Sequence, residues 1–290
     1  MDGVSRGMIS GRTKLLALIG HPVGHSLSPA MHNAGFVADD LDFVYVCLDV
    51  DPDELPAAVR GLRALKLRGF NVTMPHKRAI IPLVDGLDEE ARISGAVNTV
   101  VIEDSGLRGF NTDGGGMVMA CQEAGIGLSG KTVLLLGAGG TAAAIAVAFG
   151  KAGVGELYIA NRNIERAAQL RAKLHGTGTK GFAVHPLDAL PDAEVVINAT
   201  PLGMKEGDPM PVPPDYVREG RAFCDAVYRP GTKTPLVRLA HKRGVPVVAG
   251  DRMLLYQGVL AQKLWTGREP NVKAMDRAIS RRAVREPPLH

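Results

Sequence analysis

The sequence predicts an α/β protein with a largely parallel sheet, divided into two domains. Short apolar, strand-like runs alternate with helix-like runs along most of the chain, which is the pattern of strand–helix–strand units. The length of 290 residues is sufficient for two domains. The character of the sequence also changes near residue 113, where we expect the first domain to end.

The first domain is expected to span residues 1–113, with residues 1–12 as a loose leader. A helix is predicted from Ser28, a good N-cap residue, with Pro29 at the first helical position. A second helix is predicted over residues 51–66, where acids near the start and bases near the end suit the helix dipole. The predicted strands are residues 14–20, 43–50, 69–73, 97–102 and 106–111, the last two as a hairpin.

The second domain is expected over residues 114–249 and begins with a linking helix at 114–126. A strand, a glycine turn and an alanine-rich helix follow over residues 131–153. A later helix is predicted at 234–244, where Gly244 suits the C′ position. Further strands are predicted at residues 156–163, 193–200, 221–228 and 245–250.

The C-terminal segment, residues 250–290, is predicted to be helical as far as about Ser280. Its tail, residues 285–290, is expected to be loose. Periodicity alone does not indicate which domain these helices pack against.

The composition excludes several classes of protein. Hydrophobic residues make up 46% and charged residues 22% of the chain, as in ordinary soluble globular proteins. No run approaches the roughly 18 apolar residues of a membrane span, and no apolar segment near the N-terminus predicts a secretory signal. The net charge of +4 and the pI near 9.0 suit anionic small ligands. This charge is too mild and too evenly spread to indicate nucleic-acid binding.

The three cysteines, Cys47, Cys121 and Cys224, are far apart in the sequence and fit no metal-ligand spacing. They predict three reduced thiols in a cytoplasmic protein. A cysteine nucleophile is the less favoured alternative, and no metal is expected.

The clearest local motif is LLLGAGGTAAA, residues 134–144. A predicted strand ends at Gly137, and a helix begins after a turn that contains Gly139 and Gly140. Glycines let the backbone approach a pyrophosphate at the helix N-terminus. Ala142 follows where the third glycine of the usual pattern is missing, and a plain tight turn is the alternative. The flanking strand and helix favour dinucleotide binding.

The end of the next strand bears on which dinucleotide is bound. An NAD site usually has an acid there for the ribose 2′-hydroxyl, whereas this strand ends in Asn161-Arg162-Asn163. Arg162 can stack on the adenine and pair with a 2′-phosphate. The sequence therefore favours NADP over NAD, unless Arg162 is only a surface residue.

Polar side chains gather at the predicted strand ends and turns of the first domain. Each one has an ordinary explanation as an N-cap, a turn residue or a surface charge. Residues 70–79, for example, can be a strand end followed by a helix, with Pro75 near its first turn and Lys77 exposed. Together they predict a cleft lined by hydroxyls and amides, suited to a small, highly hydroxylated ligand. The residues are Ser26, Ser28, Asn71, Thr73, Lys77, Asn98, Thr99, Asn111, Thr112 and Asp113.

Nine motifs in a fixed order give a specific resemblance. The chain resembles the shikimate dehydrogenase family over roughly residues 15–268. The motifs are HSLSP (25–29), NVTMPHK (71–77), GAVNT (95–99), GFNTDG (109–114), GAGGT (137–141), NRN (161–163), NATPLGM (198–204), DAVYRPGTKTPL (225–236) and GDRMLLYQG (250–258).

The resemblance implies a fold and an activity. It implies an N-terminal substrate domain and a Rossmann-type NADP-binding domain around a deep cleft, with the C-terminal helices returning to the first domain. It implies NADP-linked oxidation of the 3-hydroxyl of shikimate, reversible with 3-dehydroshikimate, on the pathway to chorismate and the aromatic amino acids.

The resemblance also implies roles for individual residues. Lys77 and Asp113 match the catalytic pair. The substrate contacts match Ser26, Ser28, Thr73, Asn98, Asp113, Tyr228 and Gln257, with Asn71 and Thr99 beside them. The cofactor segments match Gly137, Ala138, Gly139, Gly140, Thr141, Asn161, Arg162, Asn163 and Arg166, with Ala226 and Gly250 near the nicotinamide.

Several alternatives stay open at this point. Lys77 is either a general base for the hydroxyl proton or a hydrogen-bond donor to the developing alkoxide. Asn163 replaces the threonine common in NADP-using relatives, and some relatives accept quinate and NAD. A noncatalytic NADP-binding sensor is an alternative of another class, although Lys77 and Asp113 are both retained. A folate dehydrogenase would predict an aromatic or apolar pocket instead. The oligomeric state is not readable, and a homodimer stays open.

Overall fold

The structure, a computed structural model, describes residues 9–179 and 181–285. Most of the predicted leader, residues 1–8, and the predicted loose tail beyond residue 285 lie outside the described residues. The chain forms two compact units. The first contains the residues up to Ala91, Val97–Thr112 and those from Gly258 onward, and the second contains Arg92–Ala96 and Asp113–Gln257.

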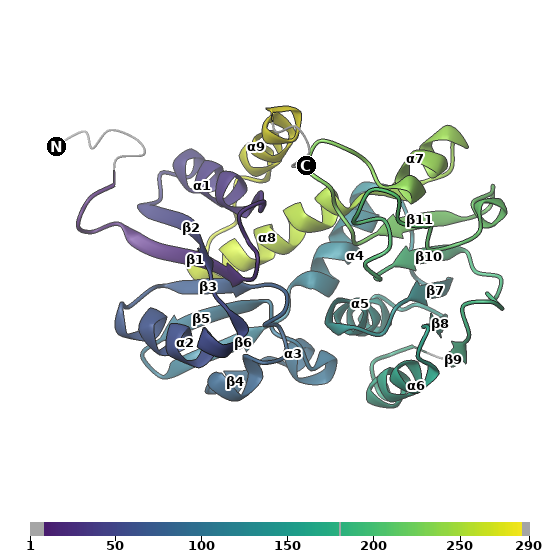
Figure 1. Cartoon of the computed structure of the whole chain (residues 1–290), viewed down its shortest axis with the longest axis horizontal. Helices are drawn as coiled ribbons and strands as arrows, with labels where there is room; N and C mark the ends of the chain where they lie inside the picture. Colours follow the sequence, from purple (N-terminus) through teal and green to yellow (C-terminus); the bar gives the residue numbers. More distant parts are fainter. Residues whose placement is uncertain (1–8, 180, 286–290) are drawn as a thin grey trace. The chain divides into compact units, whose positions relative to one another are not determined.

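The first unit contains a mixed six-stranded sheet in the order β2-β1-β3-β5-β6-β4 (Figure 1). Neighbouring strands are parallel, except that β5 runs antiparallel to both β3 and β6. The bounds are β1 Lys14–Gly20, β2 Phe43–Asp49, β3 Gly69–Val72, β4 Gly86–Leu87, β5 Thr99–Glu103, β6 Gly106–Phe110, α1 Ser28–Ala38, α2 Leu55–Ala64 and α9 Val272–Arg285, with short 3₁₀ turns η1 Pro52–Glu54 and η2 Ile81–Leu83.

Alternate residues of β1 face opposite sides of this sheet, as the period of a strand requires. Leu16 belongs to a core cluster with Phe36 of α1 and Trp265 near the end of α8, Gly250–Thr266. Ala17 belongs to a second cluster, which includes Val59 of α2. Helix α9 packs against α1 (Figure 1). Helix α9 and the part of α8 from Gly258 onward therefore belong to the first unit.

The second unit contains an entirely parallel six-stranded sheet in the order β12-β11-β10-β7-β8-β9. This is the strand order of a Rossmann fold, with the switch point between β7 and β10. The bounds are β7 Thr132–Leu136, β8 Glu156–Ala160, β9 Gly181–His185, β10 Val195–Asn198, β11 Ala222–Asp225, β12 Val247–Val248, α4 Asp113–Glu123, α5 Gly140–Lys151, α6 Ile164–Lys173 and α7 Pro235–Lys242, with the 3₁₀ turn η3 Pro214–Tyr216.

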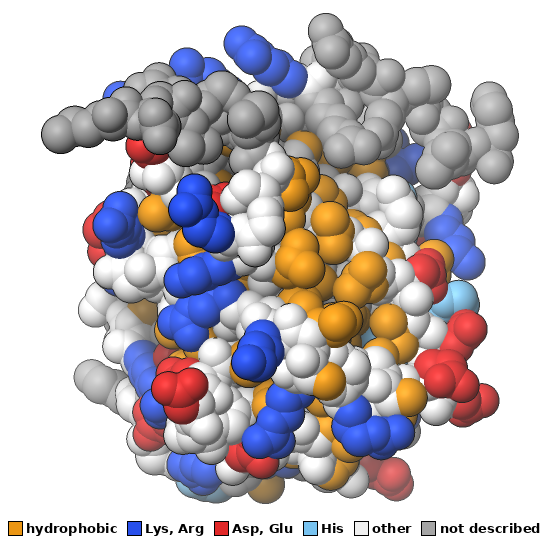
Figure 2. All heavy atoms as spheres, turned by 90° about the vertical axis from the view of Figure 1, so that its left-hand side faces the viewer, with side chains coloured by type: hydrophobic (Ala, Val, Ile, Leu, Met, Phe, Trp, Pro, Cys, Tyr) orange, Lys and Arg blue, Asp and Glu red, His pale blue; other side chains and the backbone are white. Residues whose placement is uncertain are grey.

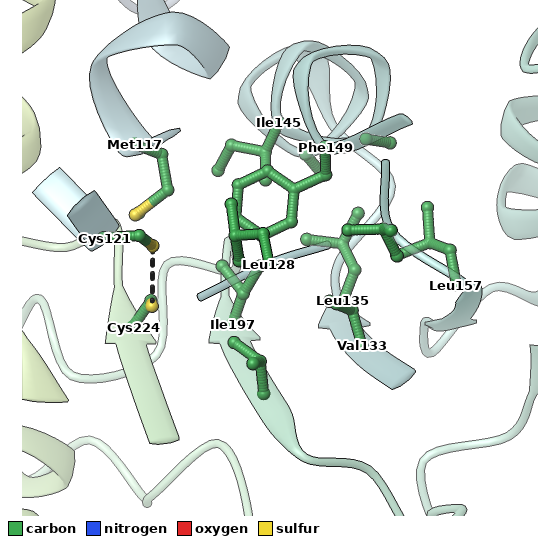
Figure 3. Close-up of a cluster of buried hydrophobic side chains, with 14 of the residues drawn as sticks. Met117, Cys121, Leu128, Val133, Leu135, Ile145, Phe149, Leu157, Ile197 and Cys224 are labelled. Atoms are coloured by element: carbon green, nitrogen blue, oxygen red, sulfur yellow. Dashed lines mark hydrogen bonds between the residues drawn. The ribbon is translucent and has the colours of Figure 1, made fainter. Parts of the chain in front are cut away.

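Both faces of this sheet are covered, which explains why β7 is a continuous apolar run. Val133 and Leu135 face a cluster that includes Phe149 of α5 (Figure 3). Leu134 and Leu136 belong to the cluster on the opposite face. In the first of these clusters, the sulfurs of Cys121 and Cys224 lie 3.5 Å apart (Figure 3). Both thiols are buried and free.

Figure 2 shows one face of the molecule, on which a band of hydrophobic side chains is bordered by lysines and arginines. Exposed apolar side chains of the first unit include Leu15 on β1 and Val46 and Leu48 on β2. Across residues 9–179 and 181–285, no helix combines the length and the apolar character that crossing a membrane requires.

One local prediction for the first unit was wrong, and one alternative, a helix after Pro75, is not found. Helix α1 is capped by Leu27 rather than Ser28, because Ser26 lies before the helix and accepts the N–H of Ser28 at 3.2 Å. No α-helix follows Pro75. Residues 74–80 form successive turns, held in part by the bond from the N–H of His76 to the oxygen of Thr73.

The predicted C-terminal helical segment consists of two helices. Helix α8 ends before Gly267, which has a φ of +68° that favours glycine. Pro270 then lies in the linker, and α9 begins at Val272. The short helix α3, Glu89–Ser94, and the elements α6 and β9 were not predicted.

Candidate active site

Most of the predicted substrate residues of the first unit lie at one edge of its sheet. Strands β1, β3 and β6 end at this edge, and the antiparallel strand β5 begins there. Ligands of open α/β sheets bind outside the carboxyl ends of strands. The residues at this edge are Ser26, Ser28, Asn71, Thr73, Lys77, Asn98 and Thr99.

Asn71 is almost fully buried and its amide is engaged within the protein. Its Nδ2 donates to the backbone oxygen of Asn98 and to the hydroxyl of Thr99, both at 3.0 Å. Its Oδ1 accepts the Tyr45 hydroxyl at 2.7 Å. Both amide hydrogens are therefore used, and only acceptor capacity on Oδ1 is left for a ligand.

Asn98 continues this buried polar cluster. Its Oδ1 accepts the backbone N–H of Thr112 and the hydroxyl of Thr99, both at 2.9 Å. The Asn98 Nδ2 also lies 2.9 Å from the Thr112 hydroxyl. The cluster ties β3 and β5 to the residues that follow β6, so it fixes the shape of this edge.

Backbone contacts bring the Lys77 and Thr73 segments to the same edge. The carbonyl of Lys77 accepts the N–H of Val97, next to Asn98, at 2.8 Å. Thr73 lies beside Gly20, where a Cβ would come within 2.3 Å of the Thr73 Cγ2. Glycine is therefore required at the end of β1, because any side chain would displace Thr73.

In the second unit, the glycine-rich loop lies at the carboxyl end of β7. Gly137 has a φ of +112°, and a Cβ there would lie 2.8 Å from the oxygen of Ala199. A Cβ on Gly139, by contrast, would meet no atom within 4 Å. Packing within the protein does not require glycine at position 139, so the open space suits the close approach of a ligand to the N-terminus of α5.

Asp113 begins α4 and contacts the start of α5. The hydroxyl of Thr141 donates to its Oδ2 at 3.1 Å, and Asp113 is 4% exposed. The two helices pack closely, because a Cβ on Gly114 would lie 2.2 Å from the backbone oxygen of Ala144. The predicted catalytic carboxylate thus lies beside the predicted cofactor loop.

The segment after β8 forms a polar turn with no acid at its first three positions. Asn163 caps α6 by accepting the N–H of Arg166 at 2.9 Å, and Asn161 donates to the oxygen of Asn163 at 2.8 Å. The side chains of Arg162 and Arg166 are exposed. Together with the open space at Gly139, these cations fit a phosphorylated dinucleotide. Within the described residues, no group of three or more His, Cys, Asp and Glu side chains could hold a metal ion.

The remaining predicted residues follow β11 or belong to α8. Ala226 donates its N–H to the oxygen of Asn198 at 2.8 Å. Gly250 packs on the peptide before Tyr228, since a Cβ would lie 2.3 Å from the oxygen of Val227. Gln257 donates to the oxygen of Leu254 at 2.9 Å.

Sequence reasoning assigned no role to three buried polar residues that support these segments. Tyr45 binds Asn71, as described above, and His32 stacks on Tyr45 with ring centroids 4.4 Å apart. Burial lowers the pKa of His32 to about 4. Burial also raises the pKa of Asp225, at the end of β11, to about 6. An aspartate inside the apolar run AFCDAV was the only sequence signal for any of them.

Comparison with known proteins agrees with this arrangement. Residues 18–100 match the family model described as the shikimate dehydrogenase substrate binding domain, and residues 119–203 match that of shikimate / quinate 5-dehydrogenase. Residues 252–279 match the shikimate 5′-dehydrogenase C-terminal domain. The chain is 58% identical over 277 residues to shikimate dehydrogenase (NADP(+)) from Rubrobacter xylanophilus, covering 94% of this chain and 97% of that protein.

Solved structures give the same relationship. A shikimate dehydrogenase in complex with NADP+ superimposes with a TM-score of 0.87 at 40% identity, covering 94% of this chain and 97% of that one. Shikimate 5-dehydrogenase from Thermus thermophilus, in complex with NADP(H) and shikimate, gives 0.84 at 37% identity and covers 92% and 99%. The chain therefore belongs to the shikimate dehydrogenase family.

Proposed function

We propose that the protein catalyses the reversible NADP-dependent reduction of 3-dehydroshikimate to shikimate, on the pathway to chorismate and the aromatic amino acids. The observation that carries this proposal is the bond between Thr141 and Asp113. It joins the residue proposed to handle the substrate to the loop proposed to bind the cofactor. The family relationship over nearly the whole chain supports the substrate.

The cofactor would be held by two segments of the second unit. The loop from Gly137 to Thr141 presents backbone N–H groups at the start of α5 to the pyrophosphate. Arg162 and Arg166 would pair with the 2′-phosphate, because guanidinium groups form charge-assisted bonds to phosphate oxygens. Ala226 and Gly250 would lie near the nicotinamide. When bound, NADP+ supplies the hydride acceptor.

The substrate would be recognised mainly by neutral donors and acceptors. We assign its carboxylate to the hydroxyls of Ser26, Ser28 and Tyr228. The ring hydroxyls are assigned to Thr73, Asn98, Asp113 and Gln257. Asn71 and Thr99 complete this set, and Asn71 contributes chiefly by holding Thr99, because both of its amide hydrogens are already bonded.

Lys77 and Asp113 would handle the hydroxyl proton. Oxidation of an alcohol removes a hydride from carbon and a proton from oxygen, and a positioned side chain is needed for the proton. Lys77 either accepts this proton or donates a hydrogen bond to the developing alkoxide. Because the hydroxyl has one hydrogen, Asp113 accepts a bond from it only in the second case, and in the first case Asp113 would favour the ammonium form of Lys77.

The cellular setting follows from the same proposal. We place the enzyme in the cytoplasm, as the free thiols of Cys47, Cys121 and Cys224 suggest. A homodimer stays a prediction. Sedimentation of the purified protein measures the oligomeric state. No nucleic-acid or membrane partner is part of the proposal.

A spectrophotometric assay tests the proposed function. Shikimate and quinate are each combined with NADP+ and with NAD+, and the absorbance of the reduced nicotinamide is followed. We expect kcat/KM to be highest for shikimate with NADP+, at least about tenfold above NAD+, because about 1.4 kcal/mol of 2′-phosphate binding gives that ratio. A preference for quinate with NAD+ would contradict the proposal, and no activity with any pair would favour an NADP-binding sensor.

A further inference from the structure

Asp225, the last residue of β11, is a fully buried carboxyl group that the proposed reaction does not use. Its Oδ1 accepts the Nδ2 of Asn198 at 2.9 Å and the backbone N–H of Val227 at 3.0 Å. Its Oδ2 accepts the hydroxyl of Thr234 at 2.6 Å. Three donors thus converge on one side chain.

These contacts fix both ends of the segment that follows β11. At its start, the N–H of Val227 is held by the Oδ1 of Asp225. At its end, Thr234 caps α7 by accepting the N–H of Val237 at 3.3 Å. Asn198 is itself tied down, because its Nδ2 also donates to the oxygen of Leu202 at 3.0 Å. Asp225 therefore connects the motifs that begin at residues 198 and 225.

The fixed segment carries residues assigned to the ligands. Ala226 and Tyr228 flank Val227, whose N–H binds Asp225. The start of α8 meets the peptide between Val227 and Tyr228, where Gly250 leaves no room for a side chain. The backbone before Tyr228 is therefore held both by Asp225 and by Gly250.

We propose that Asp225 is a positioning residue for the substrate site, which fixes the backbone of Ala226–Tyr228 and thereby places the Tyr228 side chain. This inference rests on the proposed function, which assigns Tyr228 to shikimate. It adds a residue that acts through Tyr228 without touching the substrate.

The hydrogen bonds of Asp225, rather than its charge, fix the backbone of Ala226–Tyr228. Of the groups that contact its carboxyl, Asn198, the N–H of Val227 and Thr234 do not titrate near neutral pH. The neighbouring thiol of Cys224 stays neutral, because its bond with Cys121 and its burial raise its pKa. A proton on Oδ2 would reverse the bond to Thr234 and leave both Oδ1 contacts in place. Asparagine keeps both Oδ1 contacts and reverses the third, because its Nδ2 would donate to the Thr234 hydroxyl.

Two variants separate position from charge. Asp225→Ala removes all three contacts, and Asp225→Asn keeps them. Asp215→Ala, at the exposed turn η3, is the matched control. Hydrogen exchange of peptides covering residues 226–234 is measured without ligands, and KM and kcat for shikimate are measured with NADP+.

We expect Asp225→Ala to increase exchange over residues 226–234 and to raise the KM for shikimate, each about tenfold or more, with a smaller change in kcat. Changes of this size are expected when buried hydrogen-bond donors lose their acceptor. Asp225→Asn should stay within about threefold of the unaltered protein in both measurements. Unchanged exchange and KM in Asp225→Ala, or an Asp225→Asn protein that behaves like Asp225→Ala, would overturn the proposal.

A milder pair of variants keeps the test decisive if Asp225→Ala does not fold. Thr234→Val removes the contact to Oδ2 together with the N-cap of α7, and Thr234→Ser retains both. Faster exchange over residues 226–229, at the Asp225 end of the segment, and a higher KM in Thr234→Val alone support the proposal, and equal values in the two variants oppose it. The exchange measurement needs no activity. An unaltered protein that does not oxidise shikimate would therefore refute the proposed function, while the exchange result would still decide the role of Asp225.

Discussion

The hydroxyl of Thr141 donates a hydrogen bond to the carboxylate of Asp113 at 3.1 Å. Asp113 is the first residue of α4, and Thr141 is the second residue of α5. Because α4 and α5 pack closely at Gly114 and Ala144, this bond has a defined geometry. Under the proposed function, binding of the cofactor phosphates at the start of α5 would be linked to the orientation of Asp113.

Thr141→Val should lower kcat/KM for shikimate about fivefold, because a hydrogen bond of about 1 kcal/mol that orients Asp113 is lost. Thr141→Ser keeps the hydroxyl and should retain near-normal values. Steady-state kinetics with NADP+ measure both. Equal kinetics for Thr141→Val and the unaltered protein would show that the bond does not orient Asp113 in the reaction.

Lys77→Met should lower kcat by at least about a hundredfold, because either proposed role of Lys77 acts in the transition state. The affinity for shikimate, measured by calorimetry, should change little. Lys242→Met, at the exposed end of α7, is the control for loss of a positive charge. Near-normal turnover in Lys77→Met would exclude Lys77 both as a base and as a donor to the alkoxide.

The contribution of His32 to the stability of the protein should fall between about pH 6.5 and pH 4, while that of Asp225, whose pKa burial raises to about 6, should change in the opposite direction below about pH 6. Burial lowers the pKa of His32 from 6.5 to about 4. In that range the unfolded chain takes up a proton that the folded protein does not, so stability that is fully present above pH 6.5 is lost as the pH falls. The loss from this group is up to about 3 kcal/mol.

Urea unfolding at several pH values measures the effect of His32. His32→Gln does not titrate, so the difference in free energy of unfolding between this variant and the unaltered protein should change by up to about 3 kcal/mol over this range. A variant whose pH dependence matches that of the unaltered protein would show that His32 is not the group responsible.

Asn33 protects the edge strand β2, and its loss should both destabilise the protein and promote self-association. Its side chain donates to the oxygen of Tyr45 at 2.9 Å and accepts the N–H of Tyr45 at 2.8 Å. Unpaired backbone groups at a sheet edge are a template for pairing with another chain. Exposed Val46 and Leu48 lie on the same strand.

Asn33→Ala should lower the free energy of unfolding by about 1–3 kcal/mol, measured in urea. It should also increase the mass observed by light scattering. Asn33→Asp keeps only the acceptor, so its free energy of unfolding and its mass should lie between those of Asn33→Ala and of the unaltered protein. A fully stable Asn33→Ala protein with an unchanged mass would show that Asn33 does not protect the edge.

The glycine loop was predictable because its signal is local: a strand, a turn and a helix lie together in the sequence. The strand predicted over residues 156–163 was too long, since β8 ends at Ala160. The N-cap at Ser28 was wrong because Ser26 accepts the N–H of Ser28 and the helix begins one residue after Leu27. A sequence with two serines so close together does not show which one lies before the helix.

The buried contacts behind the candidate site could not be predicted, because they join residues that are distant in sequence. The Tyr45 hydroxyl on β2 binds Asn71 on β3, with β1 between these two strands. The Nδ1 of His32 lies 3.3 Å from the Oε1 of Gln262 on α8. Asp225 meets Thr234, nine positions further along the chain, through a segment whose path depends on α7. Such pairs are fixed by the packing of the sheet and its helices, which residue types alone do not determine.

Transfer of deuterium from shikimate to the cofactor tests the central claim most directly. The unaltered protein is incubated with NADP+ and shikimate deuterated at the carbon that bears the 3-hydroxyl, and the reduced cofactor is examined by mass spectrometry and proton NMR. We predict that the reduced NADP carries the deuterium and that 3-dehydroshikimate accumulates with it. Reduced NADP without the label, or no reduced NADP at all, would contradict the proposed reaction.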